Sequence, residues 1–163
     1  MRKEKQSVVE NLVLTRIDDR LIHGQVMTAW IKNKKATQVV DDLVAEDDYM
    51  IEVLEMAIPE EIAIGIFNKE DGVTFFSQGL DEPTILLVKG PEVLNYLVDH
   101  GINIEEVDVG GMGAGNDRSV LYKNISTSSE ENDQFRALLG KNVNVFIQVM
   151  PNNKPVDISS YLK

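Results

Sequence analysis

The sequence predicts an α/β protein, built as a three-layer α/β/α sandwich around a mainly parallel central sheet. Short apolar runs rich in β-branched residues alternate with longer amphipathic segments along the chain. This alternation is typical of parallel sheets whose strands are connected by helices. Several of the runs are apolar throughout, as strands are when helices cover both faces of their sheet.

Six runs are predicted to be strands because they are short, apolar and bounded by polar or turn residues. They are residues 12–14, 38–40, 62–66, 84–88, 107–109 and 143–147. Three segments between the first four strands are predicted to be helices. Residues 23–33 carry apolar side chains at helical spacing, residues 45–58 have acidic residues in their first turns, and residues 70–79 show a weaker pattern.

Two further helices are predicted from their end signals. One begins at Pro91 and ends near Gly101, because proline is favoured in the first turn and glycine just after the last. The other begins at Ser128, which is followed three residues later by Glu131, and ends at Gly140.

The length of 163 residues fits one domain of ordinary size. We expect residues 1–9 to be an N-terminal tail and residues 10–163 to form a single domain. The chain has no cysteine, which excludes a disulfide framework, thiol catalysis and cysteine-rich metal sites. No apolar run approaches the roughly 20 residues that span a bilayer, and no apolar segment follows the basic N-terminus. We therefore expect a cytoplasmic location.

The net charge of −11 argues against a nucleic-acid surface, which requires clustered lysine and arginine. Residues 1–35 nevertheless hold 8 basic and 4 acidic side chains, a local excess of +4. This excess either keeps the tail soluble or marks a locally positive site for an anionic group.

The first strand-to-helix junction, residues 16–25, is rich in groups that do chemistry. It contains Arg16, Asp18, Asp19, Arg20 and His23. An imidazole beside an arginine and the free N–H groups of a helix start is suited to phosphate, and neutral imidazole is a nucleophile near pH 7. The alternative is a capped loop with a structural histidine.

This segment, RIDDRLIHGQVMTAWIKN, resembles the active-site segment of the IIB components of the mannose–fructose–sorbose family of the bacterial sugar phosphotransferase system. The run Val107 to Met112 resembles the second signature of that family, a strand that ends in Gly-Gly-Met. The resemblance extends over about residues 10–163. Residues 113–119 depart from the family pattern of a phenylalanine and a Gly-Lys turn.

The resemblance implies a protein-phosphohistidine–sugar phosphotransferase. His23 would accept a phosphoryl group from a IIA component and pass it to a sugar bound by the membrane components IIC and IID. Arg20, Asp18 and Gly24 would bind the phosphoryl group, and a second loop with Gly110, Gly111 and Met112 would approach it. The resemblance further implies no metal or organic cofactor, a position at the membrane transporter and the option of a homodimer. It leaves the sugar open among hexoses, hexosamines and sorbose.

The alternative function is a non-catalytic regulatory module that accepts phosphate on an acidic cluster. Asp41-Asp42 and Asp47-Asp48 are the candidates, although a strand end and a first helical turn explain them better. His100 is predicted to be structural, at a helix C-terminus. Trp30 is predicted to belong to the core, with an exposed docking anchor as its alternative role.

Overall fold

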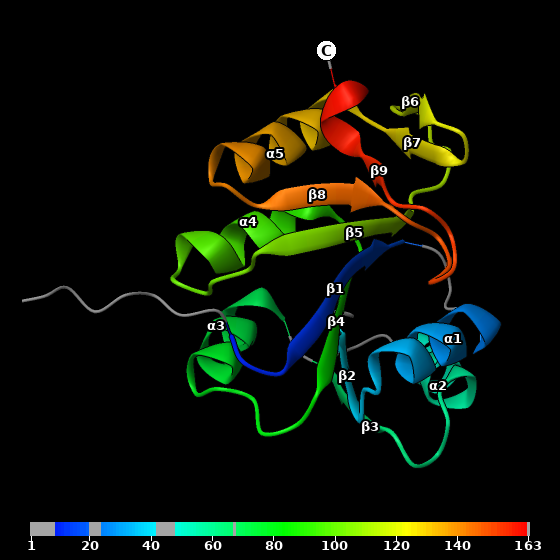
Figure 1. Cartoon of the computed structure of the whole chain (residues 1–163), viewed down its shortest axis with the longest axis vertical. Helices are drawn as coiled ribbons and strands as arrows, with labels where there is room; N and C mark the ends of the chain where they lie inside the picture. The colour runs from blue at the N-terminus through cyan, green and yellow to red at the C-terminus, as the bar shows by residue number, and fades with distance from the viewer. Residues whose placement is uncertain (1–8, 20–23, 42–47, 67, 163) are drawn as a thin grey trace, which may run out of the picture.

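The computed structural model describes residues 9–19, 24–41, 48–66 and 68–162. Its main strands are β1 (Leu12–Asp18), β2 (Gln38–Asp41), β3 (Ala63–Ile66), β4 (Thr84–Val88), β5 (Glu106–Gly111), β8 (Asn144–Ile147) and β9 (Val156–Asp157). They form one sheet in the order β3-β2-β4-β1-β5-β8-β9 (Figure 1). Neighbouring strands are parallel, except for the antiparallel pair of β8 and β9. The predicted mainly parallel sheet is thus confirmed.

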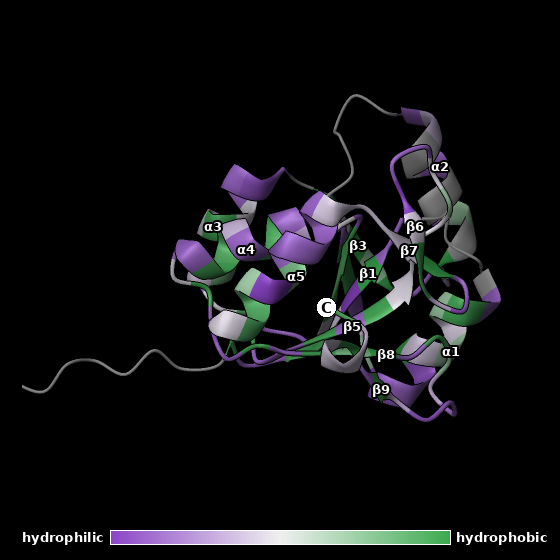
Figure 2. Cartoon of the chain, turned by 90° about the horizontal axis from the view of Figure 1, so that it is seen from above, coloured by the Kyte–Doolittle hydropathy of each residue, from purple (hydrophilic) through white to green (hydrophobic). Residues whose placement is uncertain are grey.

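The helices cover both faces of this sheet, which confirms the three-layer prediction. Helices α1 (Gly24–Lys34) and α2 (Asp48–Ala57) lie on one side, and α3 (Lys69–Ser77), α4 (Pro91–Asp99) and α5 (Ser129–Gly140) lie on the other (Figure 2). Proline stands in the first turn of α4 as predicted. The start of α5 is a capping box, in which Ser128 and Glu131 each accept a hydrogen bond from the other's backbone N–H.

An apolar core lies on each face of the sheet. The larger one packs α3, α4 and α5 on the sheet through buried side chains, among them Phe76, Leu94, Leu97, Phe135 and Leu138. The smaller one packs α1 on the sheet through Met27, Trp30 and Ile31. The two cores hold the helices against the two faces of the sheet and so fix the positions of the segments that connect strands to helices. No helix in the described ranges is both long enough and apolar enough to cross a membrane.

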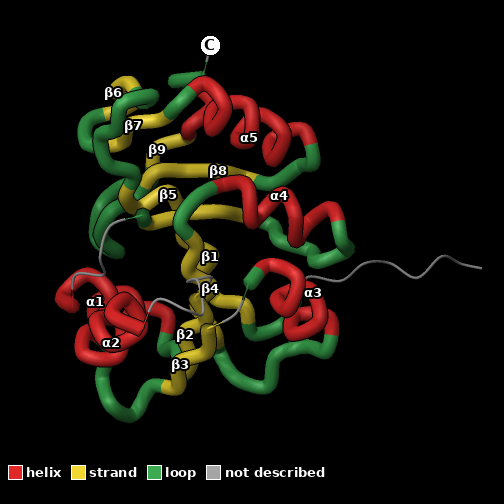
Figure 3. Tube along the Cα trace, turned by 180° about the vertical axis from the view of Figure 1, so that it is seen from behind, coloured by secondary structure: helices red, strands yellow, loops and turns green. Residues whose placement is uncertain are grey.

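The structure differs from the prediction in four places. β1 continues to Asp18, so Arg16 lies in a strand and not in the connection to α1. β5 continues to Gly111, so Gly110 and Gly111 lie in a strand and not in the expected loop, and Met112 forms a bridge to Ile125. A hairpin of β6 (Ser119–Tyr122) and β7 (Ile125–Thr127) precedes α5, and the chain ends in β9 and a short 3-10 helix. Figures 1 and 3 show the hairpin at the same end of the molecule as α5. β7, β9 and the 3-10 helix have only two or three residues each, and β6 is largely exposed, so no apolar run marks them in the sequence.

Candidate active site

Three of the predicted site residues, Asp18, Gly110 and Gly111, lie at the carboxyl ends of β1 and β5, which are adjacent parallel strands. β1 leads to α1 on one side of the sheet, whereas β5 leads through the β6–β7 hairpin to α5 on the other side. Ligands of open α/β sheets bind where neighbouring connections diverge in this way. The fold therefore makes this edge the first place to look for a site.

A buried ion pair joins the two strands just below this edge. Arg16 of β1 and Asp108 of β5 are register partners, both are 0% exposed, and Arg16 Nη1 lies 2.7 Å from Asp108 Oδ2. Burial raises the pKa of Asp108 to about 7, because desolvation outweighs the attraction of Arg16 and the hydrogen bond from the Gln148 N–H. Loss of either partner would leave an uncompensated buried charge, so the pair holds the two strand ends in a fixed relation.

Gly110 leaves the space that the Arg16 guanidinium occupies. A Cβ at position 110 would lie 2.0 Å from Arg16 Cζ and 2.2 Å and 2.4 Å from the two Nη atoms. Gly110 is not among the glycines with positive φ, so the requirement is for room and not for backbone conformation. Met112 is fully buried in the larger core. Both residues thus have structural reasons to be present, and their part in a phosphoryl site stays a prediction.

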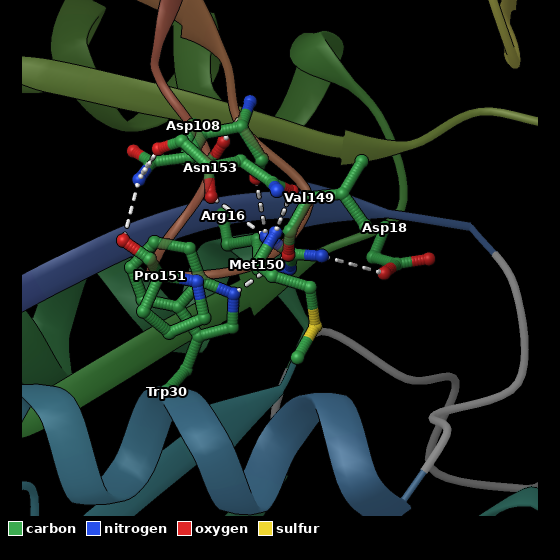
Figure 4. A network of polar contacts seen from close by, with 9 residues as sticks. Arg16, Asp18, Trp30, Asp108, Val149, Met150, Pro151 and Asn153 are labelled. Carbon is green, nitrogen blue, oxygen red and sulfur yellow. Dashed lines mark hydrogen bonds and ion pairs between the residues drawn. The ribbon is translucent and has the colours of Figure 1, made fainter.

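The same arginine organises the turn after β8. Arg16 Nη1 donates to Gln148 O (2.9 Å), and Gln148 N donates to Asp108 Oδ1 (3.0 Å). From α1, Trp30 Nε1 donates to Val149 O (2.9 Å), as Figure 4 shows. Trp30 is only 2% exposed. Its predicted place in the core is confirmed, and its alternative role as an exposed docking anchor is wrong.

The two carboxylates that follow Ile17 are each held by an arginine. Asp18 Oδ2 lies 3.4 Å from Arg16 Nη2. Asp19 is fixed more tightly, because its N–H donates to Gly111 O (3.0 Å) and its carboxylate accepts from Gly113 N (3.1 Å) and Arg118 Nη1 (2.5 Å). The start of the β1–α1 connection is therefore attached to the segment that follows β5.

Arg118 extends this attachment to α5. Its Nε and Nη2 donate to the two carboxylate oxygens of Glu131 at 2.9 and 2.7 Å, and Nη1 also donates to Gly113 O at 2.7 Å. These interactions raise the pKa of Arg118 although burial opposes them. Burial alone would raise the pKa of Glu131, but the bonds from Arg118 and the Ser128 N–H lower it overall. Segment 113–119, which departs from the expected pattern, is thus a fixed part of this edge.

The predicted site residues fall on different parts of this arrangement. His23 and Arg20 lie outside the described residues, and Gly24 is the first residue of α1. Asp18 and Gly111 end adjacent strands, and they are brought together at the sheet edge.

The alternative candidates have structural explanations where they are described. His100 follows α4, and its Nδ1 lies 2.7 Å from Tyr96 O, which confirms its structural role. Asp41 is buried at the end of β2, as predicted for a strand end, and Asp48 is the first residue of α2. Asp42 and Asp47 lie outside the described residues.

Sequence reasoning missed the pairing of Arg16 with Asp108 and the role of Arg118. The pairing of Arg16 with Asp108 could have been found from the sequence, because each of these charged residues stands in a largely apolar strand. Charged side chains in such positions are rarely buried unless they are paired. The role of Arg118 had no such signal, since its partner Asp19 is 99 positions away.

No group of three histidine, aspartate or glutamate side chains in the described ranges is arranged to hold a metal ion. A hollow of about 490 Å³ between the starts of α4 and α5 is lined by five carboxylates, those of Glu92, Asp117, Glu130, Glu131 and Asp133. These charges make it unsuited to an anionic group.

Comparison with known proteins identifies the family. Residues 12–163 match the family model described as the PTS system sorbose subfamily IIB component. The chain is 33% identical to the N-acetylgalactosamine-specific phosphotransferase enzyme IIB component 2 of Escherichia coli, with 93% of this chain and 99% of the relative covered. It is 28% identical to the mannose-specific EIIAB component of E. coli, with 90% of this chain but 48% of that longer relative covered.

The fold agrees with this match. The crystal structure of the IIBSor domain of the sorbose permease from Klebsiella pneumoniae superimposes with a TM-score of 0.86 at 28% identity, covering 92% of this chain and 94% of that one. Sequence and structure thus point to the same group of proteins along nearly the whole chain. The chain belongs to the sorbose family of IIB components of the sugar phosphotransferase system.

Proposed function

We propose that His23 accepts a phosphoryl group from the phosphohistidine of a IIA component and passes it to a sugar held by the membrane components IIC and IID, at the cytoplasmic face of the membrane. The observation that carries this proposal is the family match over residues 12–163, which includes the segment around His23. Its relative with a combined EIIAB name supports a IIA donor. The relatives are named for N-acetylgalactosamine, mannose and sorbose, so we assign no sugar.

The transfer is two displacements on phosphorus. In the first, a ring nitrogen of His23 forms a P–N bond as the P–N bond to the donor histidine breaks. In the second, a sugar hydroxyl forms a P–O bond and loses its proton as the P–N bond to His23 breaks. Neutral imidazole is a sufficient nucleophile and leaving group for both steps.

The chain's part in catalysis is to position and neutralise the transferring group. The transition state is loose and its charge is spread over three oxygens, so electrostatics and alignment contribute most of the rate. Arg20 is three residues before His23 in the chain, and a guanidinium can donate two parallel hydrogen bonds to phosphoryl oxygens. Gly24 begins α1, and the first N–H groups of a helix favour an anion.

Carboxylates beside a phosphoryl group would repel it, and their pairing at this edge addresses that problem. Asp18 and Asp19 each have an arginine within ion-pair distance. The carboxylate of Asp18 is paired with Arg16, which reduces its repulsion of a phosphoryl group. We propose this electrostatic role for Asp18 and assign it no proton transfer.

Phosphorylation followed by mapping of the label tests the proposal. The protein is incubated with labelled phosphoenolpyruvate, the general phosphotransfer proteins and a IIA component. We expect label on His23 that is labile in acid and stable in alkali, lost in His23→Ala and retained in His100→Ala. Label on an aspartate, labile to hydroxylamine, would instead support the regulatory module. The burial of Asp41 disfavours that outcome.

A further inference from the structure

We propose that Arg118 is a positioning residue for phosphoryl transfer, acting through Asp19. This inference rests on the proposed function, and it concerns a residue of the segment 113–119 to which the sequence assigned no role. Arg118 does not adjoin the active-site segment in the chain. Its side chain links three separate parts of the molecule, namely Asp19 after β1, Gly113 after β5 and Glu131 in the first turn of α5.

The geometry at Asp19 is the first argument. Asp19 immediately precedes Arg20 in the chain, and its backbone N–H and both carboxylate oxygens are hydrogen-bonded to residues 111–118. Arg118 supplies the shortest of these bonds and the only charged donor among them. The Arg118 side chain is 15% exposed and that of Asp19 is 19% exposed, so water screens the pair less than it would screen a surface pair.

Charge is the second argument. An unpaired carboxylate at position 19, four residues before His23, would repel an incoming phosphoryl group, because like charges repel strongly where water is partly excluded. Arg118 opposes this repulsion, because its guanidinium is paired with the Asp19 carboxylate. The guanidinium is also bonded to both carboxylate oxygens of Glu131 in the first turn of α5, while its bonds to Asp19 and Gly113 O hold it at the ends of β1 and β5 independently of Glu131.

The alternative is that Arg118 only stabilises α5 through Glu131. Three variants separate the two roles. Arg118→Ala removes both attachments, and Asp19→Asn removes the carboxylate charge. Glu131→Gln weakens the attachment of Arg118 to α5, and glutamine can still accept the capping hydrogen bond from the Ser128 N–H. Arg136→Ala is the matched control, since Arg136 also pairs with an acidic residue of α5 but is 43% exposed and lies on the helix surface.

The experiment is single-turnover transfer from phosphorylated IIA to this chain, measured against donor concentration, with thermal unfolding of each variant. We expect Arg118→Ala to slow transfer at saturating donor by about 10- to 100-fold, as mispositioning typically does, with the half-saturating donor concentration unchanged. Arg118→Lys should recover part of the rate, because lysine restores the positive charge but cannot donate the parallel hydrogen bonds of a planar guanidinium. Glu131→Gln and Arg136→Ala should stay within about threefold of wild type.

The decisive comparison is the double variant. If Arg118 acts through Asp19, then Asp19→Asn in the Arg118→Ala background restores rate, because it removes the carboxylate left without its arginine. A wild-type rate in Arg118→Ala, an equal loss in Glu131→Gln, or no restoration by Asp19→Asn would each overturn the inference. Failure of the wild-type chain to acquire label on His23 would overturn the proposed function itself, and this result is read before any variant is compared.

Discussion

Replacing Gly110 by alanine should destabilise the protein far more than a single added methyl group normally does. The new Cβ would lie 2.0 Å from Arg16 Cζ, whereas carbon atoms in contact need about 3.5 Å or more. The guanidinium would have to move by roughly 1.5 Å. Its bonds of 2.7 Å to Asp108 and 2.9 Å to Gln148 O cannot follow such a shift. Since breaking a buried pair costs about 3–5 kcal/mol, we expect Gly110→Ala to lose that much.

Urea unfolding measures this loss, followed by circular dichroism and by the fluorescence of Trp30, the only tryptophan. Gly65→Ala is the matched control, because Gly65 also lies in a strand but its added Cβ would be 3.8 Å from Val40 Cγ2, an ordinary contact. That control should change stability by less than about 1 kcal/mol. A Gly110→Ala protein as stable as Gly65→Ala would refute the packing argument at Arg16.

Three further outcomes follow from individual contacts. Ser128→Ala should lower the free energy of unfolding by about 1 kcal/mol through loss of the α5 cap, whereas Ser129→Ala should not, and equal losses would contradict the capping role. Trp30→Phe should cost about 1 kcal/mol or more, because it removes the donor to Val149 O; urea midpoints measure this, and an unchanged midpoint would contradict it. Because the pKa of Glu131 is lower in the folded protein, the ionised carboxylate stabilises the fold at pH values above its ordinary pKa of 4.5, and this stability is lost as the pH falls through the lower pKa of the folded state. The difference in free energy of unfolding between wild type and Glu131→Gln should therefore shrink on acidification. A difference that stays constant from neutral to acid pH would contradict this expectation.

The fold could be predicted because its signals are local. Apolar periodicity, Pro91 at a helix start and the Ser128 capping box each act within a few residues. The extent of β1 could not be predicted in this way. The charges from Arg16 onward resemble the start of a loop. The partners that make it favourable to bury Arg16 in a strand include Asp108 and Gln148 O, which lie 92 and 132 positions later.

The site divides along the same line. Asp18, Gly111 and the start of α1 could be placed at one sheet edge, because parallel strands bring their carboxyl ends together. Arg118 could not be placed there, since it belongs to a segment without periodicity and its partners lie 99 and 13 positions away. Gly110 could be recognised as part of a sequence motif. The reason that glycine is needed there, which is the space taken by the Arg16 side chain of the neighbouring strand β1, appears only in the folded structure.

The charge balance of this edge bears on how a phosphoryl carrier must work. A carrier has to receive the group and then release it, so a site with a large positive excess would hold the anion too tightly. Among the described residues at the ends of β1 and β5, the carboxylates of Asp18, Asp19 and Asp108 face the guanidinium groups of Arg16 and Arg118. These carboxylates outnumber the two guanidinium groups, so the described ends of β1 and β5 carry no positive excess. In our proposal, the attraction for phosphate therefore comes from Arg20 and the N–H groups at the start of α1.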